Sequence, residues 1–126
     1  MKKLGLDIHG VIDTKPKFFV SLAKYVISHG DEVHIITGVP FDHEAWDKLK
    51  SFNDGEEWWT HRFSITEYLK AEGHEGTQDN SGRWHFQDKL WDMAKGIYCV
   101  KNNIDLHIDD SKEYGEYFHT PYHLFK

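Results

Sequence analysis

Short apolar runs, often rich in β-branched residues, alternate along this chain with longer segments of helical periodicity. This alternation limits the fold more than any other feature, because short apolar runs favour buried strands and spacings of three and four favour amphipathic helices. The expected strands cover residues 3–8, 31–38, 61–65, 104–110 and 122–125, and the expected helices cover 17–30, 41–52 and 84–103. The predicted fold class is therefore α/β: a three-layer α/β/α, Rossmann-like sandwich with a mostly parallel sheet and helices on both faces.

The composition is that of one globular domain. The length of 126 residues predicts a single domain over residues 1–126. The lone Cys99 cannot form an internal disulfide, no apolar stretch approaches the ~20 residues of a membrane span, and Asp7 interrupts the apolar run that a secretory signal would need. A cytoplasmic protein without membrane contact is therefore expected. The net charge of -6 also opposes strong binding to duplex nucleic acid.

Polar residues stand where the expected strands end. Asp7 ends the first apolar run, Thr37 ends the second, and Asp109 and Asp110 end the last long one. The carboxyl ends of parallel strands meet at one edge of a sheet, and ligands bind there in open α/β folds. Taken singly, each residue is better explained as a strand-end cap, a core residue or a helix cap. Their convergence on one edge is what predicts a functional site.

Several carboxylates in one crevice repel one another unless a cation lies among them. Oxygen ligands without a nearby cysteine favour Mg²⁺ over zinc, and Mg²⁺ held by a few carboxylates is the usual arrangement for phosphoryl chemistry. The Thr37 hydroxyl and the Gly38 backbone N–H could donate to a phosphate oxygen. A lysine would complete such a site by neutralising charge on the phosphoryl group.

The motifs at these positions resemble those of the haloacid dehalogenase superfamily, in particular its Mg²⁺-dependent phosphatases. Members have a strand that ends in Asp-x-Asp-Gly-[Thr/Val], a second that ends in Thr or Ser, a lysine, and a last strand that ends in paired acids. The corresponding stretches here are "LDIHGVI", "HIITG", "WDMAKGIYC" and "LHIDDS", in the same order from residue 4 to residue 111. The resemblance implies a small, nucleotidase-like phosphatase without a large cap domain.

The resemblance also implies a role for each matching residue. Asp7 corresponds to the nucleophile, which attacks phosphorus and forms an aspartyl-phosphate. Thr37 and Gly38 would hold the oxygens of the transferring phosphoryl group. Asp109 and Asp110 would bind Mg²⁺ together with Asp7.

Two lysines could fill the remaining position of the pattern. Lys95 lies 14 residues before Asp109, a spacing similar to that of small nucleotidase-like members, and Lys89 is the alternative. We expect Lys95 to be the catalytic and substrate-binding lysine.

His9 stands where the superfamily has a second aspartate, which protonates the leaving oxygen and later activates water. The main-chain carbonyl at this position also binds the metal, and a histidine can supply that carbonyl. Two interpretations follow for proton transfer. Either the imidazole of His9 acts as acid and base, or the site binds phosphate and Mg²⁺ without efficient turnover.

Other conspicuous residues have plainer interpretations. Asp13 is expected to cap the turn before the first helix, and Asp42 to cap the second. His107 is expected to have a structural role in the last long strand. Trp58 and Trp59 could stack on a base, but packing is the better explanation of two adjacent tryptophans.

The space for a lid is small, because the first helix begins soon after Asp7 and only a glycine-rich loop over residues 73–83 remains elsewhere. An open site suits a small phosphorylated substrate, closed over by a neighbouring copy in a homo-oligomer, or the phosphorylated end of a larger molecule. The expected function is a Mg²⁺-dependent phosphomonoester hydrolase acting on nucleotides or nucleic-acid ends. The alternative is a catalytically impaired phosphate- and metal-binding regulatory module.

Overall fold

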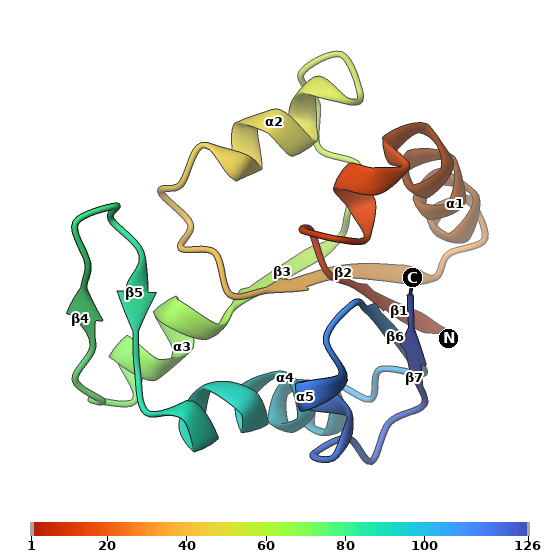
Figure 1. Cartoon of the computed structure of the whole chain (residues 1–126). Helices are drawn as coiled ribbons and strands as arrows, with labels where there is room; N and C mark the ends of the chain where they lie inside the picture. Colours follow the sequence, from red (N-terminus) through yellow and green to blue (C-terminus); the bar gives the residue numbers. More distant parts are fainter. Residues whose placement is uncertain (1, 126) are drawn as a thin grey trace.

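The structure is a computed structural model that describes residues 2–125. Its central sheet contains five parallel strands in the order β3-β2-β1-β6-β7 (Figure 1). Their bounds are β1 (Lys3–Leu6), β2 (Glu32–Thr37), β3 (His61–Ser64), β6 (Leu106–Asp109) and β7 (Tyr122–Leu124). The chain adds β2 and β3 on one side of β1 and then returns to add β6 and β7 on the other. The direction of winding therefore reverses at β1, which places a ligand crevice at its carboxyl end.

Helices cover both faces of the sheet, as predicted. Figure 1 shows α1 (Pro16–Ser28) and α2 (Ala45–Ser51) on one face, and α3 (Ile65–Ala71), α4 (Asp88–Lys101) and α5 (Lys112–Gly115) on the other. A short 3₁₀ turn, η1 (Ile12–Thr14), connects β1 to α1. The fold is thus a Rossmann-like α/β/α sandwich, and no large cap is present among the described residues.

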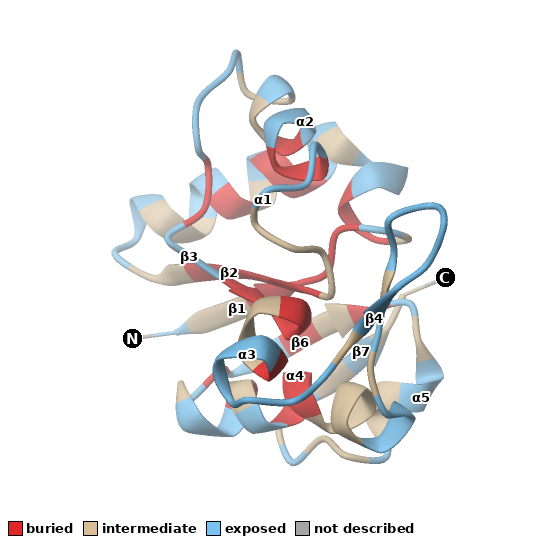
Figure 2. Cartoon of the chain, turned by 90° about the vertical axis from the view of Figure 1, so that its left-hand side faces the viewer, coloured by how far each residue is buried: buried red, intermediate tan, exposed pale blue. Residues whose placement is uncertain are grey.

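The strands are buried on both faces, which explains why their sequences are continuous apolar runs. In β2, Ile35 packs into the core beneath α1 and α2, whereas Ile36 packs into the second core beneath α3 and α4. Phe19 of α1 and Leu69 of α3 are almost fully buried in these two cores. Figure 2 shows the buried residues concentrated in the sheet and on the helix faces turned toward it.

Trp58 and Trp59 are core residues, as expected from their adjacency. Both are buried, and the indole N–H of Trp58 donates to the carbonyl of Leu49 in α2 at 2.7 Å. They therefore anchor the segment before β3 and do not line the ligand crevice.

The region after β3 differs most from the expectation. The polar loop over 73–83 contains β4 (Thr77–Gln78), which pairs antiparallel with β5 (Trp84–His85) in a short hairpin. The helix expected over 84–103 accordingly begins only at Asp88. Helix α3 was not predicted, although Ser64 and Glu67 carry a helix-start signal: the Ser64 side chain accepts the Glu67 backbone N–H at 3.2 Å.

The prediction that Asp42 caps the second helix is wrong. Helix α2 begins at Ala45, with Glu44 at the cap position and no side-chain cap bond. Gly96 lies inside α4 without ending it. The position needs a glycine because a Cβ there would come within 2.6 Å of the Tyr117 carbonyl oxygen. No helix among residues 2–125 combines the length and the apolar character needed to cross a membrane.

Candidate active site

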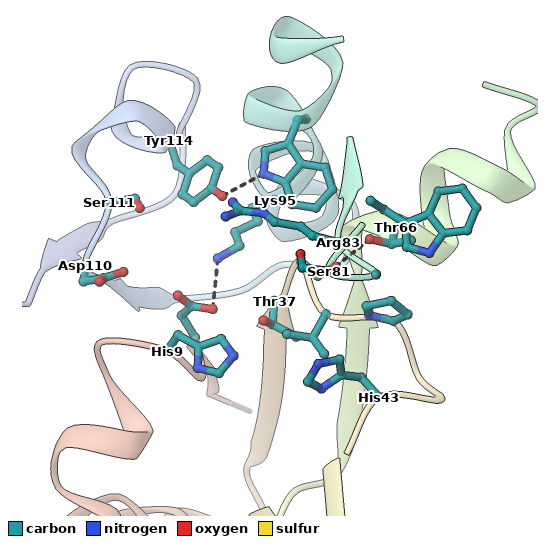
Figure 3. A pocket seen from close by; sticks show the side chains of 17 residues that line it. His9, Thr37, His43, Thr66, Ser81, Arg83, Lys95, Asp110, Ser111 and Tyr114 are labelled. Carbon is teal, nitrogen blue, oxygen red and sulfur yellow. Dashed lines mark hydrogen bonds and ion pairs between the residues drawn. The ribbon is translucent and has the colours of Figure 1, made fainter. Parts of the chain in front are cut away.

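The polar strand ends meet at one edge of the sheet, as the sequence predicted. Asp7 follows β1, Thr37 ends β2 and Asp109 ends β6. A pocket of about 680 Å³ opens at this edge (Figure 3). Six of the predicted site residues line it: Asp7, His9, Thr37, Gly38, Lys95 and Asp110. The seventh, Asp109, lies beneath them and is fully buried.

Lys95 projects from α4 to the centre of this site. Its Nζ lies 3.2 Å from Asp7 Oδ1 and 2.5 Å from Asp109 Oδ2, and the side chain is buried. Burial alone would lower the pKa of Lys95, but the two carboxylates outweigh burial and raise it. The alternative, Lys89, is exposed in the first turn of α4 and does not line the pocket.

The burial of Asp7 makes its ionised form energetically unfavourable. Burial raises the pKa of Asp7 to about 6, although the Lys95 charge opposes that rise; the Asp109 charge adds to it. Above that pH the side chain is a carboxylate with little solvation. A poorly solvated carboxylate is a better nucleophile or metal ligand than one in water.

Asp109 is oriented by His107, for which the sequence predicted only a structural role. His107 lies two residues earlier on the same face of β6, and its Nε2–H donates to Asp109 Oδ2 at 2.9 Å. Burial would raise the pKa of Asp109, but the hydrogen bond from His107 and the charge of Lys95 hold it below its usual range. Asp109 is therefore a fixed carboxylate. Its i, i+2 spacing from His107 was the available sequence signal.

Three carboxylates form a group that could hold a metal ion. Ligand oxygens of Asp7, Asp109 and Asp110 all lie within 4.8 Å of one another. Gly10, with φ of +80°, lets Asp110 approach, because a Cβ at Gly10 would collide with the Asp110 carboxylate. An all-oxygen donor set beside a cradle that only glycine permits fits a hard cation such as Mg²⁺.

His9 lies at the rim of the pocket, with 64% of its side chain exposed. Its Nδ1 lies 3.1 Å from Asp13 Oδ2, and the other Asp13 oxygen accepts the Gly10 backbone N–H at 2.8 Å. Asp13 thus caps the turn as predicted, and it also holds the imidazole. Because a carboxylate only accepts, Nδ1 carries the proton in this pair, and Nε2 remains for proton exchange.

Thr37 and Gly38 form the opposite wall. Thr37 is buried, and the Gly38 carbonyl accepts the Thr66 hydroxyl of α3 at 2.7 Å. A Cβ at Gly38 would come within 2.5 Å of the Trp91 ring, so the glycine is required for α4 to pack here. Thr66 and Trp91 were not predicted as site residues, because only the packing of α3 and α4 brings them to the pocket.

The β4–β5 hairpin contributes further side chains that the sequence did not predict. Ser81, Arg83 and Trp84 line the pocket, and Figure 3 shows the Arg83 side chain reaching inward from the hairpin. Asp79 fixes the turn: its Oδ1 accepts the backbone N–H groups of Ser81 and Arg83, at 2.9 Å and 3.0 Å. The glycine-rich loop therefore supplies an ordered wall to the pocket.

A second cluster of ligand-type residues lies at the amino ends of β2 and β3. Glu32, His34 and His61 bring side-chain donors within 4.8 Å of one another. The two imidazoles are stacked at 4.3 Å and nearly parallel, and His34 bonds Glu32 and the Tyr98 hydroxyl through its two nitrogens. Lone pairs of parallel rings do not converge on one point. This cluster is accordingly explained by hydrogen bonding alone.

No protein-family model matches the chain, and no curated protein or solved structure is significantly similar to it. The functional argument therefore depends on the fold and on the geometry of the pocket.

Proposed function

We propose that this protein is a Mg²⁺-dependent phosphomonoester hydrolase that acts through an aspartyl-phosphate on Asp7. The observation that carries the proposal is the buried Asp7–Lys95–Asp109 arrangement at the carboxyl edge of a parallel sheet, with Asp110 completing the carboxylate group. Asp7, Asp109 and Asp110 would hold the ion, together with the main-chain carbonyl of His9. When bound, Mg²⁺ would supply positive charge to the phosphate oxygens.

The residues of the chain account for both half-reactions. In the first, a carboxylate oxygen of Asp7 forms a bond to phosphorus while the bond to the leaving oxygen breaks, and His9 Nε2–H protonates that oxygen. In the second, His9 Nε2 removes a proton from water, whose oxygen attacks the same phosphorus. The products are inorganic phosphate and the regenerated Asp7 carboxylate. Lys95 and the Thr37 hydroxyl would stabilise charge on the phosphoryl oxygens.

The pairing of His9 with Asp13 supports turnover. A histidine held through Nδ1 by a carboxylate is oriented for proton transfer through Nε2, which is the arrangement of a working acid and base. The substrate class that we propose is nucleotides or nucleic-acid ends, since the pocket has aromatic walls and a volume typical of sites for small organic ligands.

The test is hydrolysis of p-nitrophenyl phosphate with Mg²⁺ between pH 5 and pH 9, with Asp7→Asn as the control. We expect a loss of at least about 10³-fold in kcat for Asp7→Asn, because the variant has no nucleophile. Wild-type protein no more active than Asp7→Asn, on this substrate and on a panel of nucleotides, would refute the hydrolase. Phosphate binding without turnover would then identify the regulatory module.

His9→Asp separates a working site from an impaired one. If His9 is the acid and base, the aspartate variant should shift the pH profile to lower pH without a large gain in rate. A gain of about 100-fold would show that the histidine limits turnover.

A further inference from the structure

The β4–β5 hairpin brings an unpaired positive charge into the pocket. Arg83 is one of two arginines in the chain, and its guanidinium has no hydrogen-bond or ion-pair partner among residues 2–125. By contrast, the charge of Lys95 is already shared between Asp7 and Asp109. Arg83 is therefore the strongly basic group of the pocket that the protein itself does not neutralise.

The position of Arg83 is built rather than incidental. The Arg83 backbone N–H donates to Asp79 Oδ1 at 3.0 Å, and its carbonyl accepts the Asp79 N–H at 2.9 Å. His85 holds the other Asp79 oxygen at 2.8 Å. The residue that precedes β5 is thus fixed at both of its backbone groups. These bonds fix the backbone from which the Arg83 side chain extends to the pocket, where its guanidinium fork can bind an anion.

The wall beside Arg83 is aromatic. Trp84 and Trp91 both line the pocket, and Phe86 stacks between them with ring-centroid separations of 6.3 Å and 6.2 Å. Lys70 Nζ of α3 lies 3.7 Å from the Trp84 ring centroid, and this cation–π contact links the tryptophan to α3. Indole surfaces next to a guanidinium fork suit a ligand that combines a flat ring with a phosphate.

We propose that Arg83 forms a second anion subsite, which binds a phosphate of the substrate other than the one transferred to Asp7. The ligand class is a nucleotide with two phosphates attached to the sugar. It is either a nucleoside bisphosphate or the phosphorylated end of a nucleic-acid strand. In the strand, the phosphodiester next to the terminal phosphate is the second anion. This inference rests on the proposed function, which places the transferred phosphate of the ligand at Asp7. Binding of the second phosphate at Arg83 does not require turnover.

Binding is best measured on Asp7→Asn protein, so that no probe is consumed. The probes are adenosine 3′,5′-bisphosphate, adenosine 5′-monophosphate, and a 5′-phosphorylated dinucleotide, each titrated by calorimetry with Mg²⁺ present. Arg83→Gln is the test variant. Arg62→Gln is the matched control, because it removes the same charge from an exposed arginine that stacks on Phe41, 4.0 Å from the ring centroid, and does not line the pocket.

The bisphosphate or the dinucleotide should bind about 10- to 100-fold more weakly to Arg83→Gln, since a charged hydrogen-bonding pair is lost. The affinity of Arg83→Gln for the monophosphate should change by less than about threefold. Arg62→Gln should leave the affinities for all three probes nearly unchanged. Whichever of the two diphosphorylated probes binds more tightly identifies the source of the second phosphate. The salt dependence of its affinity should also become shallower in Arg83→Gln.

Two results would overturn the subsite. Equal losses for the monophosphate and the diphosphorylated probes would place Arg83 on the transferring phosphate, and no loss for any probe would leave the guanidinium without a ligand. Failure of the hydrolase assay does not bear on these affinities. A catalytically inactive protein that loses bisphosphate binding in Arg83→Gln would retain the subsite and refute only the proposed reaction.

Discussion

At the scale of single residues, the burial of Asp7 makes its ionised form costly to the folded state. Its pKa is raised from 3.8 to about 6, so the unfolded chain holds this carboxylate in its ionised form more readily than the folded protein does. The folded state therefore loses stability as pH rises from about 4 to about 6, and the full cost is present at neutral pH. The neutral amide of Asn would not carry this cost.

We therefore expect Asp7→Asn to raise the free energy of unfolding by about 1–3 kcal/mol at pH 7.5, measured by urea denaturation with a chelator present. Added Mg²⁺ should stabilise the wild type more than the variant, which keeps two of the three carboxylates, because a ligand stabilises most the state that binds it most tightly. A variant less stable than the wild type would show that the pairing of Asp7 with Lys95 outweighs its desolvation.

The role of His9 can be tested by a substitution at Asp13 that leaves His9 itself unchanged. Asp13→Asn retains an oxygen for the Gly10 N–H but removes the carboxylate that holds His9 Nδ1. We expect kcat to fall about 10-fold with little change in KM, because orientation of the acid and base matters to chemistry more than to binding. Asp42→Asn, at an exposed position outside the pocket, is the control. Unchanged kcat in Asp13→Asn would separate His9 from proton transfer.

Gly5 shows how a strand residue supports the site from behind. A Cβ at this position would come within 2.7 Å of Ile36 Cδ1 and 2.8 Å of His107 Nδ1. Gly5→Ala should thus lower the free energy of unfolding by about 1–3 kcal/mol, measured by chemical denaturation. It should also lower kcat, since His107 would be displaced from Asp109. Normal stability together with normal activity would contradict this packing.

At the scale of elements, the parallel register of the sheet positions the site, and the hairpin shapes it. Leu6 of β1 pairs with Ile35 of β2 and Ile108 of β6, so the residues that follow these partners meet at one edge. The hairpin depends on local bonds instead. The hydrogen bonds from Ser81 and His85, with the backbone N–H groups of Ser81 and Arg83, keep the pKa of Asp79 far below its usual range.

Asp79→Ala should accordingly loosen the hairpin without unfolding the domain. With its backbone anchor lost, Arg83 would sample more conformations, and we expect KM for the preferred nucleotide to rise about 3- to 10-fold while the melting temperature changes by less than about 2 °C. Steady-state kinetics with a thermal melt measure both quantities. A large fall in melting temperature would mean that the hairpin supports the core, contrary to its exposure in Figure 2.

At the scale of the whole molecule, two buried histidines couple folding to pH. Burial lowers the pKa of both His34 and His107, although carboxylate partners oppose the shift. An unfolded histidine takes up its proton near pH 6.5, whereas these two do so only at lower pH. Their contribution to stability is therefore complete above that pH and is lost progressively as pH falls below it.

Asp7 titrates in the opposite sense over an overlapping range, so Asp7→Asn protein reports the histidines more cleanly. Between pH 7 and pH 5 we expect its free energy of unfolding to fall by about 1–2 kcal/mol, and the further change His34→Gln should reduce that fall. Urea denaturation at several pH values measures the slope. A flat profile in the Asp7→Asn protein would contradict the burial of His34 and His107 as the source of pH dependence.

The layer architecture and most of the candidate site can be predicted from the sequence, because both depend on local patterns. Apolar runs define strands that are buried on both faces, and residues at the ends of parallel strands must share one edge. Asp7, Thr37 and Asp109 were identified for that reason. The preference for Lys95 over Lys89 came from its spacing to Asp109, and the folded chain places Lys95 between Asp7 and Asp109.

The side chains that orient and surround these groups could not be predicted, because long-range packing brings them there. Asp13 beside His9 and His107 beside Asp109 depend on side-chain direction within a turn and a strand, and Arg83 reaches the pocket through a hairpin whose strands contain two residues each. Such short strands have almost no periodicity, so their pairing depends on Asp79 and on packing against α3 and α4. The aromatic wall of the pocket likewise comes from Trp84 and Trp91, not from the conspicuous Trp58–Trp59 pair, because burial in a core or beside a cavity depends on contacts between distant segments.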